Sequence, residues 1–297
     1  MKLYSPAVIA ALREKHNFKI SKSLGQNFLT DQNIIDKIIE GAQIEEGDIV
    51  LEIGPGMGVL TAATAERASK VIAIEIDKNL LPILADTLTG YKNVEIIHGD
   101  VLKLNLNDVI SQSFKSDTIS SGSGGNNVAP KVKIIGNLPY YITTPIIMKI
   151  LEEKTHAQSI TIMMQKEVAE RINAKPGTKV YGAITVAINY YCTVHHIVDV
   201  SRGVFIPQPN VDSQVLRLDI REAPPVFVES EKMFFACIKA GFGQRRKTLL
   251  NSLTGINGLE KQEVLEALQK AKIDPTRRAE TLSLSEFATL SNCIVAY

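Results

Sequence analysis

The chain has 297 residues, 45% of them hydrophobic, and a formal net charge of +1 at pH 7. This length exceeds the roughly 200 to 250 residues of a single α/β domain and predicts two unequal domains. Because no window approaches the roughly 18 consecutive apolar residues that span a bilayer, we expect no membrane association. The apolar patch at residues 7–12 runs directly into charge, so we expect no secretory signal either.

The three cysteines lie far apart in the sequence, at Cys192, Cys237 and Cys293. Their spacing is that of neither a metal site nor a redox pair. We therefore expect packing roles for all three, no metal site, and a reducing, cytoplasmic location.

Basic residues cluster in three places. The segment 1–30 is basic, and two shorter clusters follow at 245–247 and 277–278. A nearly neutral protein with such patches can still follow a phosphate backbone. Each cluster taken singly is equally consistent with an ordinary solvated surface.

Strand-like and helix-like segments alternate between about residue 30 and residue 200. The run 31–39 has helical apolar spacing, and 48–53 is a buried-strand run that ends at a glycine-rich turn. Further strands are expected at 71–77, 94–100, 132–137, 160–165 and 194–200. This alternation predicts parallel βαβ units in a doubly wound α/β sheet. The Gly/Ser/Asn-rich stretch 116–130 predicts a solvated, flexible loop without chemistry.

The character of the sequence changes after Pro207. A half-buried strand is expected over 213–220, and helices are expected from the runs 231–242, 245–253 and 260–271. The sequence Ser283-Leu-Ser-Glu286 predicts a capping box that begins a last helix. We therefore predict a domain of residues 1–206 and a small, mainly helical domain of residues 207–297.

The first turn of the predicted sheet has the pattern of a nucleotide site. Gly54, Gly56 and Gly58 follow the first strand, where missing side chains let a ligand approach the backbone. Glu75 ends the next strand, about 20 residues on, and is placed to accept from ribose hydroxyls. Asp100 ends the third strand, where it can accept from an adenine amino group. These features predict an adenosine-containing cofactor, and NAD would account for them almost equally well.

The sequence Asn137-Leu138-Pro139-Tyr140 follows the fourth strand directly. The N6 lone pair of adenine is delocalised into the ring and is a poor nucleophile. The Asn137 side-chain carbonyl and the Leu138 backbone carbonyl can hold the two N–H groups and stabilise the positive charge that develops on nitrogen. Pro139 stiffens the turn, and Tyr140 can stack on the base and lie near a sulfonium. A simple turn before a helix would also tolerate Asn-x-Pro.

Nine segments, taken together, resemble the bacterial small-subunit rRNA adenine dimethyltransferases, the KsgA/RsmA family. They include SLGQNFL (23–29), EIGPGMGVLT (52–61), EID (75–77), GD (99–100), GNLPYYITTPI (136–146), MMQKEVAERI (163–172), YGAITV (181–186), FIPQPNVDS (205–213) and FGQRRKTLLNSL (242–253). The resemblance runs from about Lys22 to near the C-terminus. Only the first twenty residues and the 116–130 loop lack a matching motif.

The resemblance implies a Rossmann-like class I methyltransferase fold with a small helical C-terminal domain, and S-adenosylmethionine as cofactor. The family dimethylates two adjacent adenosines in a hairpin loop near the 3′ end of small-subunit rRNA, so N6,N6-dimethyladenosines are the expected product. The expected partner is this rRNA within the small ribosomal subunit or its precursor, and a further role in small-subunit biogenesis is implied. We expect the enzyme to be a monomer.

Carried over residue by residue, the resemblance implies three groups of site residues. The cofactor would lie among the segment that closes over it, the glycine turn and the strand ends, with Ile76 and Val101 sandwiching the adenine ring and Asn137 at the methyl donor. This group comprises Gln26, Asn27, Leu29, Gly54, Gly56, Glu75, Ile76, Asp100, Val101 and Asn137. Asn137 and Tyr140 match the catalytic pair, Phe205 the second aromatic of the base site, and Leu138 leaves room for a monomethylated amine. RNA binding is assigned to Arg245, Arg246 and Lys247, at the start of a predicted helix.

Three alternatives stay open at this point. A large-subunit rRNA methyltransferase of the macrolide-resistance type shares the cofactor motifs, but the 244–253 helix and the helical tail favour the small subunit. A non-catalytic assembly factor is disfavoured by the intact catalytic residues. An NAD-linked oxidoreductase needs a histidine in the cleft, and His98, His195 and His196 all lie within strand-like runs.

Overall fold

The computed structural model describes residues 1–118 and 131–295. Their contacts divide the chain into two compact units. Unit 1 comprises Met1–Lys166 and His195–Ile220, and unit 2 comprises Glu167–Val194 and the residues from Arg221 onward. No helix in these described ranges is long and apolar enough to cross a membrane.

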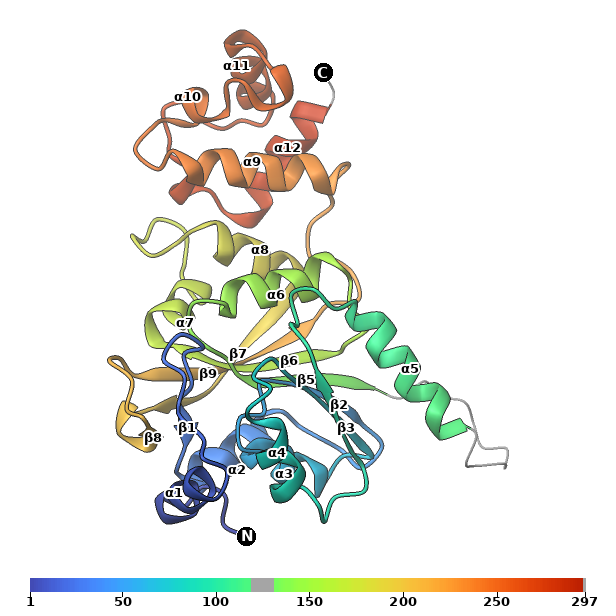
Figure 1. Cartoon of the computed structure of the whole chain (residues 1–297). Helices are drawn as coiled ribbons and strands as arrows, with labels where there is room; N and C mark the ends of the chain where they lie inside the picture. Colours follow the sequence, from blue (N-terminus) through green and yellow to red (C-terminus); the bar gives the residue numbers. More distant parts are fainter. Residues whose placement is uncertain (119–130, 296–297) are drawn as a thin grey trace. The chain divides into compact units, whose positions relative to one another are not determined.

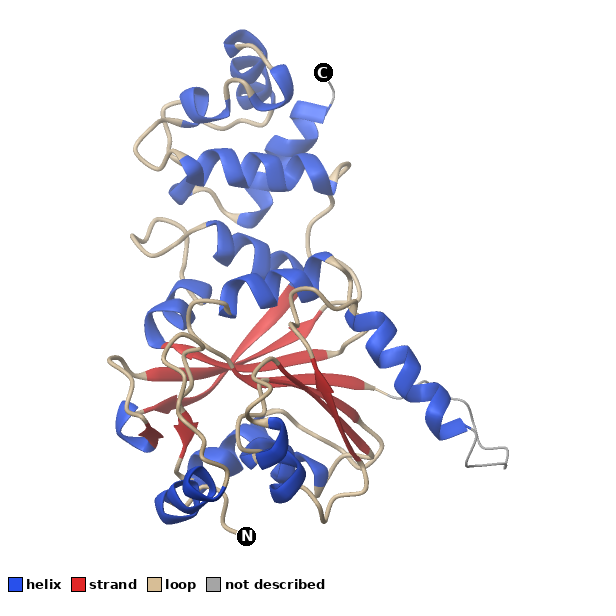
Figure 2. Ribbon diagram, in the orientation of Figure 1, coloured by secondary structure: helices blue, strands red, loops and turns tan. Residues whose placement is uncertain are grey.

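A seven-stranded sheet with the order β4-β3-β2-β5-β6-β9-β7 forms the centre of unit 1 (Figure 2). Its strands are β2 (Ile49–Ile53), β3 (Lys70–Glu75), β4 (Val94–His98), β5 (Val132–Asn137), β6 (Ser159–Gln165), β7 (Cys192–Val200) and β9 (Ser213–Ile220). Strands β2 to β6 pair in parallel, and β9 pairs antiparallel to β6. The predicted doubly wound α/β sheet is confirmed.

Helices cover both faces of this sheet, with α2, α3 and α4 on one face and α6 on the other (Figure 1). The helices of unit 1 are α1 (Pro6–Lys15), α2 (Gln32–Gly41), α3 (Val59–Ala65), α4 (Leu81–Thr87), α5 (Leu106–Thr118) and α6 (Thr143–Glu152), with the 3-10 turn η1 (Arg202–Val204). Asp31 caps α2 by accepting the N–H groups of Asn33 and Ile34, as residues with short polar side chains do at helix starts. Isoleucines of α2 then pack into the core beneath the sheet.

The predicted loop 116–130 begins later than expected, because α5 continues to Thr118. The remainder of that prediction, residues 119–130, lies outside the described residues.

The strand order reverses between β2 and β5. The chain runs outward from β2 through β3 to β4 and then returns to β5 on the other side of β2. In open α/β sheets such a reversal leaves a crevice at the carboxyl ends of the strands, where ligands bind. Gly136 in β5 permits the close packing there, because a Cβ on it would lie 2.8 Å from the carbonyl oxygen of Ile53.

Strand β9 differs from the prediction in both burial and place. We expected a half-buried strand in the C-terminal domain, but Ser213 to Leu218 are buried on both faces, since β9 lies between β6 and β7. Two further short strands, β1 (Phe28–Leu29) and β8 (Phe205–Ile206), pair antiparallel. The contacts therefore do not follow a single boundary at 206/207: residues 207–220 complete the first sheet, and 167–194 join the helical unit.

Unit 2 is helical, as predicted for most of this region. Its helices are α7 (Lys166–Ile172), α8 (Ala183–Tyr191), α9 (Glu231–Gly243), α10 (Leu249–Leu253), α11 (Lys261–Lys270) and α12 (Leu284–Val295), with the 3-10 turns η2 (Ile256–Gly258) and η3 (Ala279–Thr281). They enclose an apolar core around Phe234 and Phe287. The capping box of α12 is confirmed: Ser283 Oγ accepts the Glu286 N–H at 3.2 Å, and Glu286 Oε2 accepts the Ser283 N–H at 2.8 Å.

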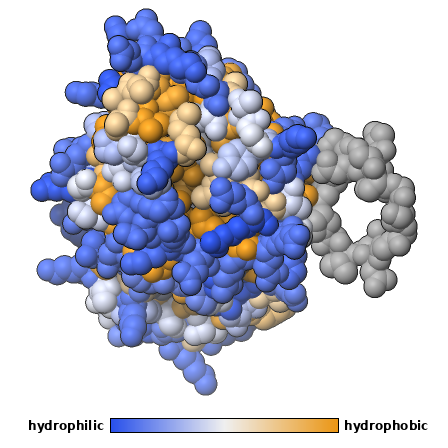
Figure 3. Space-filling model, turned by 90° about the horizontal axis from the view of Figure 1, so that it is seen from below, coloured by the Kyte–Doolittle hydropathy of each residue, from blue (hydrophilic) through white to orange (hydrophobic). Residues whose placement is uncertain are grey.

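The surface seen from below is mostly hydrophilic, and hydrophobic residues show between the polar ones towards its middle (Figure 3). Scattered apolar atoms of this kind are normal on a protein surface.

Candidate active site

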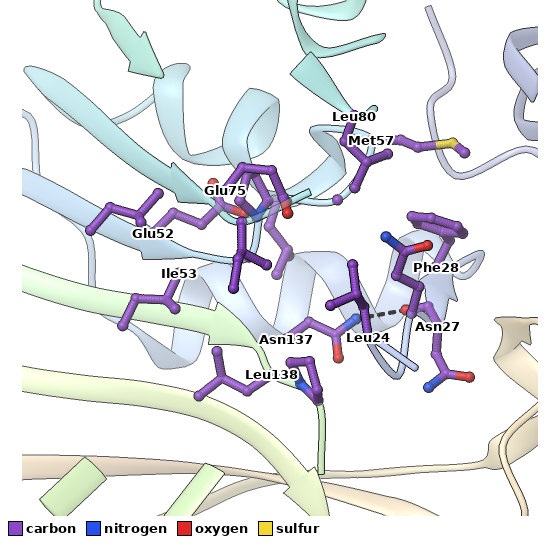
Figure 4. Close-up of a pocket in the computed structure, with 18 of the residues that line it drawn as sticks. Leu24, Asn27, Phe28, Glu52, Ile53, Met57, Glu75, Leu80, Asn137 and Leu138 are labelled. Atoms are coloured by element: carbon purple, nitrogen blue, oxygen red, sulfur yellow. Dashed lines mark hydrogen bonds between the residues drawn. The ribbon is translucent and has the colours of Figure 1, made fainter. Parts of the chain in front are cut away.

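A cavity with about 1070 Å³ of empty space, part of it continuous with solvent, opens at the carboxyl ends of β2, β3, β4 and β5, at the strand-order reversal (Figure 4). Every residue that the sequence assigned to the cofactor lines this one cavity, and so does Leu138. These residues are Gln26, Asn27, Leu29, Gly54, Gly56, Glu75, Ile76, Asp100, Val101 and Asn137. The structure thus brings together positions that span more than a hundred residues of sequence.

The glycine turn after β2 needs its glycines for backbone reasons. Gly54, Gly56 and Gly58 have φ angles of +72°, +60° and +88°, in the left-handed region that side chains disfavour. A Cβ on Gly54 would meet only the Asn137 carbonyl oxygen, at 3.9 Å, so the cavity is open at this point. The turn therefore leaves space for a ligand against its backbone.

Two carboxyl groups stand in the wall beside this turn. Glu75 is 4% exposed and its Oε1 accepts the Asp77 N–H at 2.8 Å, and burial raises its pKa to about 7. Glu52, on β2, is 1% exposed, and burial together with the nearby Glu75 raises its pKa to about 8. Glu52 Oε2 is buried without a hydrogen-bond partner in the described part of the chain. The site therefore presents acceptors that lack solvent and suit a ligand with hydroxyl or amino donors.

Sequence reasoning did not single out Glu52. The signal was present, because a carboxylate inside a fully buried strand run is rare unless it has a partner.

The N-terminal segment is held along the cavity by side-chain amides. Gln26 Nε2 donates to Asp77 Oδ2 at 2.7 Å, and Gln26 Oε1 accepts the Ser21 N–H at 2.8 Å. Asn27 Nδ2 donates to the Gly25 carbonyl at 2.9 Å. Both ends of the Gln26 amide thus fasten this segment beside the loop that follows Glu75.

The orientation of the Asn137 amide follows from one hydrogen bond, drawn as a dashed line in Figure 4. Asn137 Nδ2 donates to the backbone carbonyl of Asn27 at 3.0 Å. Because a carbonyl oxygen can only accept, the atom that faces it must be the nitrogen. The Oδ1 atom is left without a hydrogen-bond partner among the described residues. Asn137 therefore offers the cavity an acceptor.

Tyr140 and Phe205 do not line the cavity. The Tyr140 hydroxyl lies 2.7 Å from Ser213 Oγ, and burial, with a contribution from Asp212, raises the pKa of the phenol, which stays neutral. Phe205 is 3% exposed and pairs with Leu29 across the β1–β8 ladder. Ser213 was also missed by sequence reasoning, since a lone serine at the start of a strand carries no pattern.

The basic cluster of unit 2 departs from the prediction. Residues 245–247 form a turn before α10 and do not open the helix, which begins at Leu249. The Arg245 guanidinium donates to the carbonyls of Lys179 at 2.8 Å and Tyr181 at 3.1 Å, and these bonds hold the turn against the 179–181 segment. Arg246 and Lys247 are exposed, and neither side chain has a partner among the described residues.

The histidines required by an oxidoreductase lie elsewhere. His98, His195 and His196 are not among the residues that line the cavity. His195 and His196 instead contact the carboxylates of Asp219 and Asp199 on the sheet. The structure therefore gives no support to hydride transfer through a histidine in this cavity.

Comparison with known proteins identifies the family. The model of the ribosomal RNA adenine dimethylases matches residues 17–295. The chain belongs to this family. The resemblance drawn from the motifs is confirmed, and with it the predicted enzyme class, an S-adenosylmethionine-dependent rRNA adenine dimethyltransferase.

Members of the dimethylase family are similar to this chain over nearly its whole length. The "Ribosomal RNA small subunit methyltransferase A" of Alkaliphilus oremlandii is 52% identical, covering 98% of this chain and 97% of the relative. That of Clostridioides difficile is also 52% identical, covering 95% and 93%.

Solved structures of the dimethylase family and its neighbours share the fold. A dimethyladenosine transferase from Plasmodium falciparum superposes with a TM-score of 0.71 at 28% identity, covering 88% of this chain and 95% of that one. The 23S rRNA methyltransferase ErmE gives 0.64 at 25% identity, covering 90% and 99%. The large-subunit alternative is therefore not favoured, because the small-subunit relatives share about twice as many identical residues.

Proposed function

We propose that the enzyme transfers methyl groups from S-adenosylmethionine to N6 of two adjacent adenosines in a hairpin loop near the 3′ end of small-subunit rRNA, giving N6,N6-dimethyladenosines. The observation that carries the proposal is the Asn137 amide, whose Oδ1 is turned free at the cavity by the bond to Asn27. The 52% identity to small-subunit methyltransferases supports the choice of substrate.

The cavity residues fit the cofactor by their chemistry. The buried Glu75 carboxylate suits the ribose hydroxyls, Asp100 suits the adenine amino group, and Ile76 and Val101 offer apolar contact to the ring. The open backbone at Gly54 suits the methionine part, and Gly56, where a Cβ would lie 3.3 Å from the Phe28 ring, lines the same cavity. When bound, S-adenosylmethionine supplies an electrophilic methyl group on a sulfonium.

The chain's own part in methylation is to prepare the amine. Asn137 Oδ1 and the Leu138 backbone carbonyl accept the N–H groups of adenine N6, which favours a pyramidal nitrogen and stabilises its developing charge. Asn137 Nδ2 keeps this geometry through its bond to Asn27. The charged product then loses its proton to water, so no general base is needed.

Two aromatic rings would flank the target base, Tyr140 on one side and Phe205 on the other. Extruding a base costs a few kcal/mol, and stacking of about 1–3 kcal/mol per base offsets much of that. The Tyr140–Ser213 hydrogen bond supports this assignment for Tyr140, because it fixes the ring. The β1–β8 pair supports it for Phe205, because its strand partner Leu29 lines the cavity, although Phe205 itself is buried outside the lining.

RNA binding is proposed for the turn that carries Arg245, Arg246 and Lys247. Arg246 and Lys247 are available to phosphates, whereas Arg245 mainly holds the turn through the Lys179 and Tyr181 carbonyls. We place the reaction on the small subunit or its precursor, with a monomeric enzyme in the cytoplasm and a further role in subunit biogenesis. The three free cysteines are consistent with that reducing compartment.

Replacing both Arg246 and Lys247 by alanine is expected to weaken RNA binding and to reduce the slope of log K against log salt by about 1.5, at about 0.7–0.9 per phosphate contact. Lys261 and Lys270, two exposed lysines of α11, provide a double-alanine control with the same charge change. Binding is measured by titration at several salt concentrations. An unchanged slope, or an equal change in the control, would show that the turn does not contact phosphate.

Labelled S-adenosylmethionine offered to small subunits that lack the modification tests the function itself. We expect label in N6,N6-dimethyladenosine at two adjacent positions near the 3′ end, identified by nucleoside analysis and mapping. Free large-subunit rRNA serves as the control substrate. Label that appears there instead, or only in monomethyladenosine, would refute the proposal.

A further inference from the structure

Tyr141 is an aromatic side chain left in solvent beside the catalytic motif. It is 61% exposed, and among the described side chains of unit 1 it is the only exposed aromatic one. Its neighbour Tyr140 is partly buried and hydrogen-bonded to Ser213. Tyr141 is not among the predicted site residues, and the proposed chemistry does not use it.

The ring of Tyr141 lies beside Gly25, which lines the cavity. A Cβ built on Gly25 would lie 3.5 Å from Tyr141 Cε1 and 3.1 Å from Pro139 Cβ, so the N-terminal segment and the catalytic turn meet there. The cavity is lined by Pro139 and Ile142, which lie before and after Tyr141 in the sequence, and by Gly25 on the N-terminal segment. An occupant that extends out of the cavity past Gly25 and Pro139 therefore passes close to Tyr141.

Lys22 adds a positive charge to the turn that contains Gly25. Lys22 is exposed, and its carbonyl accepts the Gly25 N–H at 3.1 Å, in the turn that contacts Tyr141. Proteins that hold single-stranded nucleic acid combine aromatic faces, on which bases stack, with basic side chains along the backbone. Tyr141 and Lys22 provide both on two segments that touch.

We propose that Tyr141 is the stacking platform for the nucleotide adjacent to the adenosine in the cavity, with Lys22 close to the phosphate that joins the two. This inference rests on the proposed function and deepens it, because that substrate carries two adjacent target adenosines. While one adenine is held for methylation, the next one rests on Tyr141. A stacked base tolerates N6 methyl groups, since they lie in the plane of the ring, so the platform serves whichever adenosine is modified first.

The test compares Tyr141→Ala with wild type on two substrates. One is the unmodified small subunit, and the other is the same subunit reconstituted with an abasic nucleotide next to the first target adenosine. On the intact substrate we expect Tyr141→Ala to lose about 10-fold in kcat/KM, mainly through KM, as the loss of one stacked base predicts. On the abasic substrate we expect wild type and variant to be equal, because the platform has nothing to hold.

Three controls make the result decisive. Tyr141→Phe keeps the ring, so its kcat/KM on the intact and on the abasic substrate should match the wild-type values. Phe227→Ala removes an aromatic side chain that is 77% exposed in unit 2, and it should leave kcat/KM on both substrates unchanged. The dissociation constant for S-adenosylmethionine reports whether the Tyr141→Ala protein is folded.

Two outcomes would overturn the assignment of Tyr141: an equal loss on both substrates, or no loss on either, with the wild type still active on intact subunits. A wild type that does not methylate intact subunits would instead refute the proposed function.

Discussion

Replacing Asn137 by alanine is expected to lower kcat for methyl transfer by about 10²–10³-fold, the effect typical of losing one preorganised hydrogen-bond partner at a reacting centre. The reason is the free Oδ1 acceptor, which Nδ2 holds in place through the Asn27 carbonyl. Affinity for S-adenosylmethionine should stay within about tenfold of wild type, because Glu75 and the glycine turn are untouched. Single-turnover kinetics with unmodified small subunits, alongside cofactor titration, separate the two quantities.

Asn137→Asp is the informative companion variant. It keeps an acceptor for the amine but turns a second oxygen towards the Asn27 carbonyl. In the wild type, Asn137 Nδ2 lies 3.0 Å from that carbonyl oxygen. We expect activity between those of alanine and wild type, because repulsion displaces the side chain. If Asn137→Ala kept the wild-type kcat, the amide would have no part in catalysis.

Replacing Glu75 by alanine is expected to weaken S-adenosylmethionine binding by about 10- to 100-fold, the range for losing hydrogen bonds to a charged group, and to abolish methylation at ordinary cofactor concentrations. The carboxylate is buried in the cavity wall, where no solvent competes for it. Isothermal titration measures the loss. Equal affinity in wild type and variant would exclude Glu75 from the cofactor site.

The pH dependence of binding follows from the same group. Without ligand, burial raises the pKa of Glu75 to about 7. Hydroxyl donors from the ribose stabilise the ionised carboxylate and lower that pKa, so binding releases a proton. Affinity should therefore be constant above about pH 7 and fall as the pH decreases below it, by up to tenfold per unit. Glu75→Gln should bind weakly and without this dependence.

Titrations in two buffers of different ionisation enthalpy detect the released proton directly. A wild-type affinity that is flat from about pH 5 to pH 8, or that rises on acidification, would contradict this account of Glu75.

The cofactor residues were predictable because their positions follow from topology. Gly54, Glu75, Asp100 and Asn137 each stand at or just beyond the carboxyl end of a strand, and parallel strands bring those ends to one edge. A strand pattern with its turns is therefore enough to place them together. The same reasoning recovered the capping box of α12, which is a purely local signal.

What the sequence did not reveal depends on pairing between distant segments. Strand β9 pairs antiparallel with β6, which is distant in the sequence. The residues of β9 alone are equally consistent with a strand that has one face in solvent. The Ser213 hydroxyl that holds Tyr140 becomes relevant only through that pairing. Arg245 looked like a free cation, and only the fold shows the carbonyls to which it donates.

The bond between Asn137 and the Asn27 backbone has a consequence for how the enzyme can fail. The acceptor that faces the amine is set by a peptide carbonyl more than a hundred residues upstream, in the segment that Gln26 fastens to Asp77. A substitution elsewhere in the chain that loosens this N-terminal segment would release the amide to rotate, although Asn137 itself is unchanged. Such a protein would turn over poorly, a defect that the catalytic motif 137–140 alone does not reveal.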